Sequence, residues 1–493
     1  MAVQKNSAQQ SHSSRASHSL KKKSSEAKSG RWLWFCLGMT GVAMLSATAG
    51  ALLAFSFSSK PLMQSKLSSK DELVFGQGAP ISGNGLQFSQ LTRPVNILVL
   101  GMSVLPEDVR NPPAETQHLS YSPQVNSFEG LSDTMLLLRF NPQTKKLIAL
   151  SIPRDTRTLV EGHGIEKINA ANLGGGAALS AKTVSNLLGG VEIDRYIRVN
   201  VLGFAKLVDV LGGVTFYIPK DMKYKDDTQH LYVNLKAGKQ HLNGDQAMQL
   251  LRFRHDALGD IGRIQRQQLM MRTLMEQALN PATLAQLPQI LQVVQSYIDT
   301  NLTVSELFAI AGFAAQSNRS NVNMLMVPGR FSGPEEYNTS YWIPNHKGIT
   351  NLITKHFDLA SQSSQHASEP AALSIVIQDS TGHPRAVRAL VRTLEASGYR
   401  NVQIAKPWTE NLSMTHIVAQ QGDGDSAEAI RNALGLGEVR VESTGLLNSD
   451  VTIRLGQDWL QRKATSARLT EIGSREQRSE QGEKRSRRSK NHH

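Results

Sequence analysis

The stretch that decides the fold is Thr134-Met-Leu-Leu-Leu-Arg-Phe-Asn-Pro-Gln-Thr-Lys-Lys-Leu-Ile-Ala-Leu-Ser-Ile-Pro-Arg-Asp155. Two apolar runs flank a polar turn at 141–145, a pattern that predicts a β-hairpin. Both runs are hydrophobic at nearly every position, as in strands whose two faces are both covered. The hairpin is therefore expected to lie inside a sheet that has helices on either side.

The register of this hairpin predicts a cluster of charges at one end. A turn centred on the middle of the loop pairs Leu138 with Ala149, and the same count brings Asp133 opposite Arg154. Asp155 follows directly. Two carboxylates beside an arginine at a strand end could hold a metal ion and a phosphate. The alternative is a solvated strand end with one ion pair.

Composition sets the broad class. A chain of 493 residues predicts two or three domains. The net charge of +13 is compatible with nucleic acid, an anionic membrane surface or an anionic substrate, although much of the excess lies in the two tails. The single cysteine, Cys36, lies in an apolar N-terminal stretch. This excludes a disulfide, a CxxC zinc site and a cysteine nucleophile in a soluble domain.

The N-terminal region predicts a membrane anchor. No charged residue lies between Arg31 and Lys60, and this run is long enough to cross a bilayer. The basic flank before it predicts a cytoplasmic N-terminus, which would make this a single-pass protein of the cytoplasmic membrane with its bulk outside, or in the periplasm. A cleaved signal peptide is the alternative.

Composition also divides the chain into segments. Alternating strands and helices predict an α/β (α+β) fold, a mixed central sheet covered by helices, and then a second small α/β domain. Helices are expected at 178–188 after a glycine turn, at 204–211 and at 246–251. The predicted segments are 1–31 disordered tail, 32–57 transmembrane helix, 58–92 stalk, 93–359 main domain, 360–370 linker, 371–458 C-terminal domain and 459–493 disordered basic tail.

A second charged stretch lies at 242–274. Arg263 and Gln267 are four residues apart on one predicted helix and so share a face. Phe253 between two arginines suggests an extended segment that points both arginines the same way. Arginine forks match phosphate oxygens, so the stretch predicts a site for a pyrophosphate-sized anion, with a basic solvated face as the alternative. Its arginines are Arg252, Arg254, Arg263 and Arg266, with Asp256 and Asp260 among them.

These motifs resemble the LytR-CpsA-Psr (LCP) family. Residues 371–458 are similar to the separate C-terminal domain that often follows the LCP domain. Over about residues 93–280 the match runs through Asn96-Ile-Leu-Val-Leu-Gly101, Ser132-Asp-Thr134, Ser151-Ile-Pro-Arg-Asp155, Lys167-Ile-Asn-Ala-Ala171, Leu211-Gly-Gly-Val214, Leu242-Asn-Gly244, Arg252-Phe-Arg254, Gly259-Asp-Ile-Gly-Arg263 and Arg266-Gln-Gln268.

The resemblance implies a membrane-anchored enzyme that moves a glycopolymer from a polyprenyl-pyrophosphate carrier onto peptidoglycan, with a divalent metal, usually Mg²⁺. It also implies an apolar tunnel for the lipid tail. Asp133 would hold the metal, and Gln267 would assist at the pyrophosphate. Asp155 and Asp260 would orient the arginines or take a proton. The pyrophosphate would be bound by Arg154, Arg252, Arg254 and Arg263, of which Arg154 and Arg263 would act in catalysis with the two aspartates.

Two positions depart from the family pattern. Met102-Ser103 stands where the family usually has an aspartate, and Leu131 stands where an arginine is common. Glu107 or Asp108 could replace the missing carboxylate. No helix-turn-helix or stacking platform indicates nucleic acid as a partner. A hydrolase of the lipid-linked glycan and a non-catalytic wall-binding or regulatory protein remain as alternatives.

Overall fold

The fold is that of a computed structural model, in which the expected N-terminal tail and membrane span lie outside the described residues. Among the described residues, no helix is both long and apolar enough to span a bilayer. The structure describes residues 62–63, 66–76, 80–83, 90–102, 128, 130–226, 231–253, 259–278, 283, 286–317, 321–357, 369–446 and 449–462.

A six-stranded mixed sheet forms the centre of the first domain, in the order β11-β6-β1-β2-β3-β12. The β1–β2, β2–β3 and β6–β11 pairs are antiparallel, whereas β1–β6 and β3–β12 are parallel. This confirms the predicted mixed sheet. Its strands are β1 (Val95–Met102), β2 (Ser132–Asn141), β3 (Lys146–Ile152), β6 (Arg195–Val199), β11 (Ile298–Thr300) and β12 (Val322–Met326).

The central hairpin has the predicted register. Leu138 pairs with Ala149, and the ladder continues to Met135 opposite Ile152. At the turn, the side-chain oxygen of Asn141 accepts hydrogen bonds from two backbone N–H groups, each at 3.1 Å. Such an Asx turn gives this polar loop its own hydrogen bonds. Continued two residues past this last pair, beyond the end of β3, the same register places Asp133 opposite Arg154.

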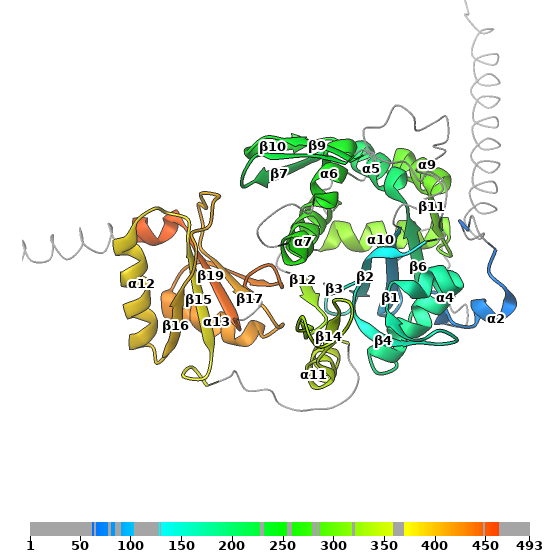
Figure 1. Cartoon of the computed structure of the whole chain (residues 1–493). Helices are drawn as coiled ribbons and strands as arrows, with labels where there is room; N and C mark the ends of the chain where they lie inside the picture. The colour runs from blue at the N-terminus through cyan, green and yellow to red at the C-terminus, as the bar shows by residue number, and fades with distance from the viewer. Residues whose placement is uncertain are drawn as a thin grey trace, which may run out of the picture. The chain divides into compact units, whose positions relative to one another are not determined.

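Both faces of the sheet are covered, as the continuous hydrophobic pattern predicts. On one face, Leu98, Leu137 and Leu150 belong to a buried cluster with α4 (Ala170–Leu187) and α11 (His346–His356). On the other face, Ile97 and Leu136 belong to a cluster with α7 (Gly259–Ala278) and α10 (Val304–Gln316). Figure 1 shows α4 and α10 on opposite sides of the central strands. Alternate residues of each strand thus point to opposite layers.

A third buried cluster extends this domain beyond the sheet. It joins α5 (Val201–Val210) and α6 (Gly244–Arg252) to two ribbons, β7–β10 (Val214–Ile218, Gly238–Leu242) and β8–β9 (Met222–Asp226, Leu231–Leu235). The N-terminus of α6 is a capping box formed by Asn243 and Gln246, which satisfies two backbone donors. The remaining described elements here are β4 (Arg157–Val160), β5 (Gly164–Lys167), β13 (Gly329–Phe331), β14 (Trp342–Pro344), α2 (Ser69–Glu72) and α9 (Leu287–Tyr297).

The glycine turn predicted before the helix at 178–188 is present. The backbone leaves the helical region at Gly175 and Gly176, and Gly176 has φ +61° and ψ −151°. Only glycine adopts that conformation readily. A helical segment that was not predicted, beginning at Ala170, precedes this kink, and α4 (Ala170–Leu187) includes both segments.

The C-terminal domain is a five-stranded sheet in the order β16-β15-β19-β17-β18, with described helices at 384–396, 424–434 and 457–462. The sequence pattern predicts strands at 416–419 and 451–455, and the structure has strands with these bounds. One strand, β18 (Glu438–Val441), was not predicted. The other elements are β15 (Ser374–Asp379), α12 (Pro384–Ala396), β16 (Asn401–Ile404), β17 (His416–Ala419), α13 (Gly424–Leu434) and β19 (Val451–Leu455).

Candidate active site

The hairpin end gathers the three predicted charges. Arg154 Nη1 forms an ion pair with Asp133, and Arg154 Nε lies 3.4 Å from a carboxylate oxygen of Asp155. The other carboxylate oxygen of Asp155 lies 2.8 Å from Lys167 Nζ. All four side chains are partly buried, between 17% and 30% exposed. A charge pair in this setting is screened less by solvent than one on the open surface.

The backbone at Arg154 and Asp155 is held by two distant segments. The carbonyl of Arg154 accepts a hydrogen bond from Asn169 N at 3.2 Å, and the carbonyl of Asp155 accepts one from Trp342 N at 2.9 Å. Thr156 N closes a turn onto the carbonyl of Pro153 at 2.9 Å. Both side chains therefore leave a backbone that is fixed from two directions.

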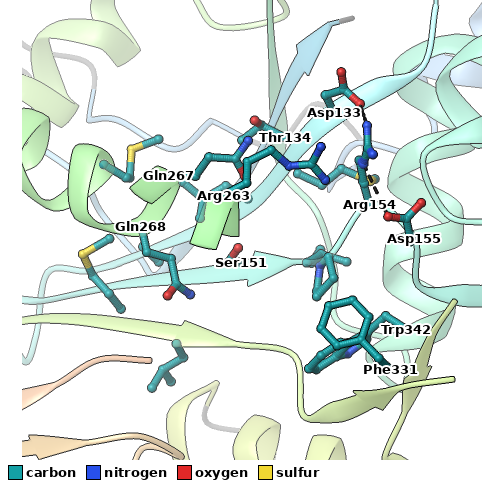
Figure 2. A pocket seen from close by; sticks show the side chains of 18 residues that line it. Asp133, Thr134, Ser151, Arg154, Asp155, Arg263, Gln267, Gln268, Phe331 and Trp342 are labelled. Carbon is teal, nitrogen blue, oxygen red and sulfur yellow. Dashed lines mark hydrogen bonds and ion pairs between the residues drawn. The ribbon is translucent and has the colours of Figure 1, made fainter. Parts of the chain in front are cut away.

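Helix α7 brings the second group of predicted residues to the same place. Arg263 and Gln267, four residues apart, both line a pocket with Asp133, Arg154 and Asp155. Figure 2 shows Arg263 extending from the helix toward Arg154. Arg263 is only 4% exposed, so its charge lies where an anion would be attracted strongly. The sequence spacing placed these two on one helical face, but only the packing of α7 brings them to the hairpin.

The pocket is lined by both polar and apolar side chains, and its volume is about 40 Å³. Thr134, Ser151 and Gln268 add polar groups to the charged ones. The apolar lining consists of Met135, Leu136, Ala149, Ile152, Pro153, Met271, Met324, Leu325, Phe331 and Trp342. The charged residues suit an anionic head group, and the apolar lining suits the start of a hydrocarbon chain.

Sequence reasoning missed the aromatic wall. Phe331 and Trp342 belong to β13 and β14, and their rings pack edge to face with centroids 5.1 Å apart. Trp342 Nε1 donates to the carbonyl of Val327 at 3.2 Å. The signal available was the short aromatic Tyr341-Trp342 pair, but nothing local indicated that it would meet Asp155.

Not every predicted residue lies in the pocket. Arg252 is the last residue of α6, so the extended segment predicted for it begins only at Phe253, and Arg252 is not among the pocket-lining residues. The Arg266 guanidinium donates a hydrogen bond to the carbonyl of Phe253 and lies over the Phe253 ring, on another side of α7. Arg254 and the side chain of Asp260 lie outside the described residues.

The LytR_cpsA_psr family model matches residues 62–358, well over half of the chain. The chain belongs to the LytR-CpsA-Psr family. A second model, described as LytR cell envelope-related transcriptional attenuator, matches residues 372–459.

Several characterised or solved members of the LCP family are similar. A polyisoprenyl-teichoic acid–peptidoglycan teichoic acid transferase, TagU of Bacillus mycoides (strain KBAB4), is 29% identical over 337 residues, which is 66% of this chain and 98% of the relative. The regulatory protein MsrR of Staphylococcus aureus (strain COL) is 33% identical over 214 residues, 43% of this chain and 63% of MsrR. The crystal structure of B. subtilis TagV aligns with a TM-score of 0.43 at 26% identity, over 55% of this chain and 99% of TagV.

Met102-Ser103 stands where the LCP family usually has an aspartate, and Ser103 lies outside the described residues. Met102, the last residue of β1, is 5% exposed, and its sulfur lies 3.0 Å from Asn172 Nδ2. The same amide donates to the carbonyls of Phe128 and Gly130 at 3.0 and 2.8 Å. Asn172 thus fills the space beside Met102 with a neutral network. Glu107 and Asp108, which could supply a carboxylate, lie outside the described residues.

Asp133 is the predicted metal ligand. It is 30% exposed and lines the pocket, as does Asp155, which also lies against Lys167. Among the described residues, no group of three or more His, Cys, Asp or Glu side chains could form a complete protein cage. Mg²⁺ needs only one or two protein carboxylates when phosphate oxygens and water complete its shell. The donor set therefore fits Mg²⁺ that arrives with a pyrophosphate.

Proposed function

We propose that this chain transfers a glycopolymer, as its glycosyl phosphate, from a polyprenyl-pyrophosphate carrier to peptidoglycan. The observation that carries the proposal is the meeting of Arg154 and Arg263, far apart in sequence, in one pocket that also has an apolar lining. Membership in the LCP family supports it, as does the similarity to a relative named as a teichoic acid transferase. The anchor predicted at 32–57 would keep the enzyme on the membrane that holds its donor, with the catalytic domain outside.

The arginines suit a pyrophosphate for a chemical reason. A guanidinium keeps its charge at any working pH and presents paired N–H groups to phosphate oxygens. Phosphoryl transfer depends mainly on charge neutralisation and on the alignment of attacking and leaving oxygens. Arg154 and Arg263 would bind the two phosphates, and Gln267 would donate from the adjacent turn of α7.

The reaction follows from this placement. A sugar hydroxyl of the acceptor attacks the carrier-distal phosphorus, a new P–O bond forms, and the bond to the bridging oxygen breaks. Polyprenyl phosphate leaves, and its negative charge stays beside the arginines. Asp155, which lies at the pocket edge, would accept the hydroxyl proton. Asp260 is a further proposed base or orienting group.

Asp133 would hold Mg²⁺ against the pyrophosphate oxygens. When bound, the ion would neutralise charge that develops on the phosphates. The ion pair between Asp133 and Arg154 then has a second use, because it places the guanidinium beside the metal-binding carboxylate.

Replacement of Arg154 or Arg263 by Ala tests the assignment. Either change should lower turnover of a lipid-linked glycan donor by about 10²-fold or more, because a phosphate-binding donor is lost in the transition state. Arg431→Ala, which removes an exposed pair with Glu428 in α13, is the matched control. The measurement is glycan attached to peptidoglycan per unit time, with the melting temperature of each variant recorded. If Arg154→Ala and Arg263→Ala both turned over the donor at the wild-type rate, the proposal would be refuted.

Hydrolysis of the same donor is the second candidate, because water could replace the acceptor at an identical site. Assay of the products with and without peptidoglycan separates the two. Transfer requires the glycan to become covalently attached to the wall polymer. A hydrolase would release glycan phosphate at the same rate in both assays. A wall-binding protein would consume no donor at all.

A further inference from the structure

A surface of two tyrosines and two cations lies beside the pocket; we name Arg157, Lys167, Tyr337 and Tyr341 the tyrosine platform. The guanidinium carbon of Arg157 lies 5.0 Å from the ring centroid of Tyr337 and 5.9 Å from that of Tyr341. Lys167 Nζ lies 5.7 Å from the Tyr341 centroid. The two rings meet edge to face at 5.2 Å and 81°. The four side chains thus form one contiguous group.

The platform is continuous with the catalytic residues. Lys167 Nζ lies 2.8 Å from the Asp155 carboxylate. Arg157 pairs with Lys167 across the β4–β5 ribbon, so the two cations share one end of it. Tyr341 directly precedes Trp342, whose N–H donates to the carbonyl of Asp155 and whose ring lines the pocket. Asp155 therefore lies between the platform and the donor arginines.

The loop that carries the tyrosines is held in shape. Its two ends are joined by Ser332 N, which donates to the carbonyl of Tyr341 at 2.8 Å, and by Tyr341 N, which donates to Ser332 Oγ at 3.0 Å. Arg330 donates to both carboxylate oxygens of Glu336 at 2.8 Å each. Both platform tyrosines are partly exposed. The rings are thus presented to solvent in a fixed position, which lowers the entropy cost of binding.

We propose that the tyrosine platform binds the acceptor, a strand of N-acetylated amino sugars with carboxylate-bearing stem peptides; this inference rests on the proposed transferase function. Sugar rings offer polarised C–H groups, which suit the negative face of an aromatic ring. The carboxylates of the stem peptides complement Arg157 and Lys167. A sugar hydroxyl of a glycan strand bound to the platform then lies near Asp155 before it reaches the donor phosphate. The Asp155 carboxylate can therefore accept the hydroxyl proton at the point of attack.

The position distinguishes acceptor from donor. The donor anion is bound by Arg154 and Arg263 inside the pocket, whereas the platform lies outside it, on the far side of Asp155. In-line attack requires the nucleophile and the leaving group to lie on opposite sides of the phosphorus. An acceptor on the platform would approach the donor phosphorus from outside the pocket, past Asp155.

The test compares full-length wild type with the double variant Tyr337→Ala/Tyr341→Ala. Binding of a soluble, uncross-linked peptidoglycan strand is measured directly, and transfer to that strand is measured beside hydrolysis of the same donor. The double variant should bind the strand at least tenfold more weakly and lose transfer by a similar factor, while hydrolysis of the donor stays unchanged. Phe308→Ala removes an aromatic ring, 43% exposed, from α10 and is the matched control.

A second comparison tests the role of charge. Arg157→Gln should weaken binding of strands that carry stem peptides and leave binding of peptide-free strands unchanged. Equal strand binding by wild type and the double variant would overturn the platform, whatever the enzyme's activity. If the variant loses binding but wild type consumes no lipid-linked donor, the platform stands and the proposed transferase function fails. A double variant that has lost donor hydrolysis as well, at a normal melting temperature, would place the tyrosines in the donor site and overturn the assignment.

Discussion

Asp133 combines two possible roles at a single carboxylate. It forms an ion pair with Arg154, and it lines the proposed pyrophosphate site together with Asp155. Met102-Ser103 stands in the place of the usual family aspartate, and Met102 is buried against Asn172. A metal held by fewer protein oxygens depends more on the phosphates of the donor. Binding of Mg²⁺ is therefore expected to require the lipid-linked substrate.

Asp133→Asn separates these roles. The variant loses the charge but keeps the shape, so the Mg²⁺ concentration for half-maximal turnover should rise about tenfold, because carboxylate is a far better Mg²⁺ ligand than amide. The measurement is turnover across a Mg²⁺ titration. Asp221→Asn, at an exposed carboxylate paired with Lys236, is the control and should behave as wild type. Lower turnover at an unchanged Mg²⁺ midpoint would mean that Asp133 only orients Arg154.

The residue types of the site could be read from the sequence, but not all of their surroundings. Asp133 and Arg154 lie on one hairpin, so a count of paired positions brings them together. Phe331 and Trp342 lie far from the hairpin in sequence. Their position depends on the hydrogen bond from the backbone N–H of Trp342 to the backbone carbonyl of Asp155. A single sequence contains no signal for such a contact.

At the scale of elements, α4 shows how glycine changes a helix. Ala177, Ala181 and Val184 of α4 are buried against the sheet. The break at Gly175–Gly176 turns the second part of the helix onto that face. Without the break, the segment that begins at Ala170 would continue along its first axis.

Gly176→Ala should therefore destabilise the protein by about 1–3 kcal/mol, because alanine is strained at φ +61° and ψ −151°. Urea unfolding followed by circular dichroism measures the change. Gly333→Ala is the control, since that glycine does not have a positive φ and the nearest atom to an added Cβ lies 3.9 Å away. A loss below about 0.5 kcal/mol at Gly176 would show that the kink is not required for stability.

Element prediction succeeded where patterns were long and failed where they were short. The β2–β3 hairpin has two apolar strands and a turn with its own hydrogen bonds, so its register could be predicted. Strand β18 (Glu438–Val441) has the sequence Glu-Val-Arg-Val and lies at the edge of its sheet with every residue half-buried. Four residues of that kind resemble a loop until a partner strand is known.

At the scale of the whole molecule, the pocket exists because two distant parts of the chain pack on one sheet. Helix α7 lies on the face that includes Leu136 and Ala149, and it buries Met275 there. That packing directs Arg263 and Gln267 toward the hairpin end and places Met271 in the apolar lining. At about 40 Å³ the pocket has no room for a polyprenyl chain, so the expected tunnel requires the flexible methionines to move.

Met271→Trp tests where the lipid tail lies. A larger, stiffer ring in the apolar lining should lower turnover of a long-chain polyprenyl donor at least tenfold and leave a donor with a short prenyl chain within threefold of wild type. The assay compares kcat/KM for the two donors. Leu173→Trp, at a side chain of α4 that is 58% exposed, controls for the added indole. An equal loss with both donors would mean that the substitution disturbs the head-group site, and no loss with either would place the tail elsewhere.

The sequence by itself determined the covered hairpin, its register, the helical face shared by Arg263 and Gln267, and the mixed α/β class of the fold. These follow from hydrophobic periodicity, turn chemistry and spacing, which act between near neighbours in the chain. Only the tertiary structure decided that Arg263 meets Arg154, that Arg252 and Arg266 lie outside the pocket, and that Tyr341 and Trp342 adjoin Asp155. Those contacts join segments far apart in the chain, and their geometry depends on how helices and strands pack in three dimensions.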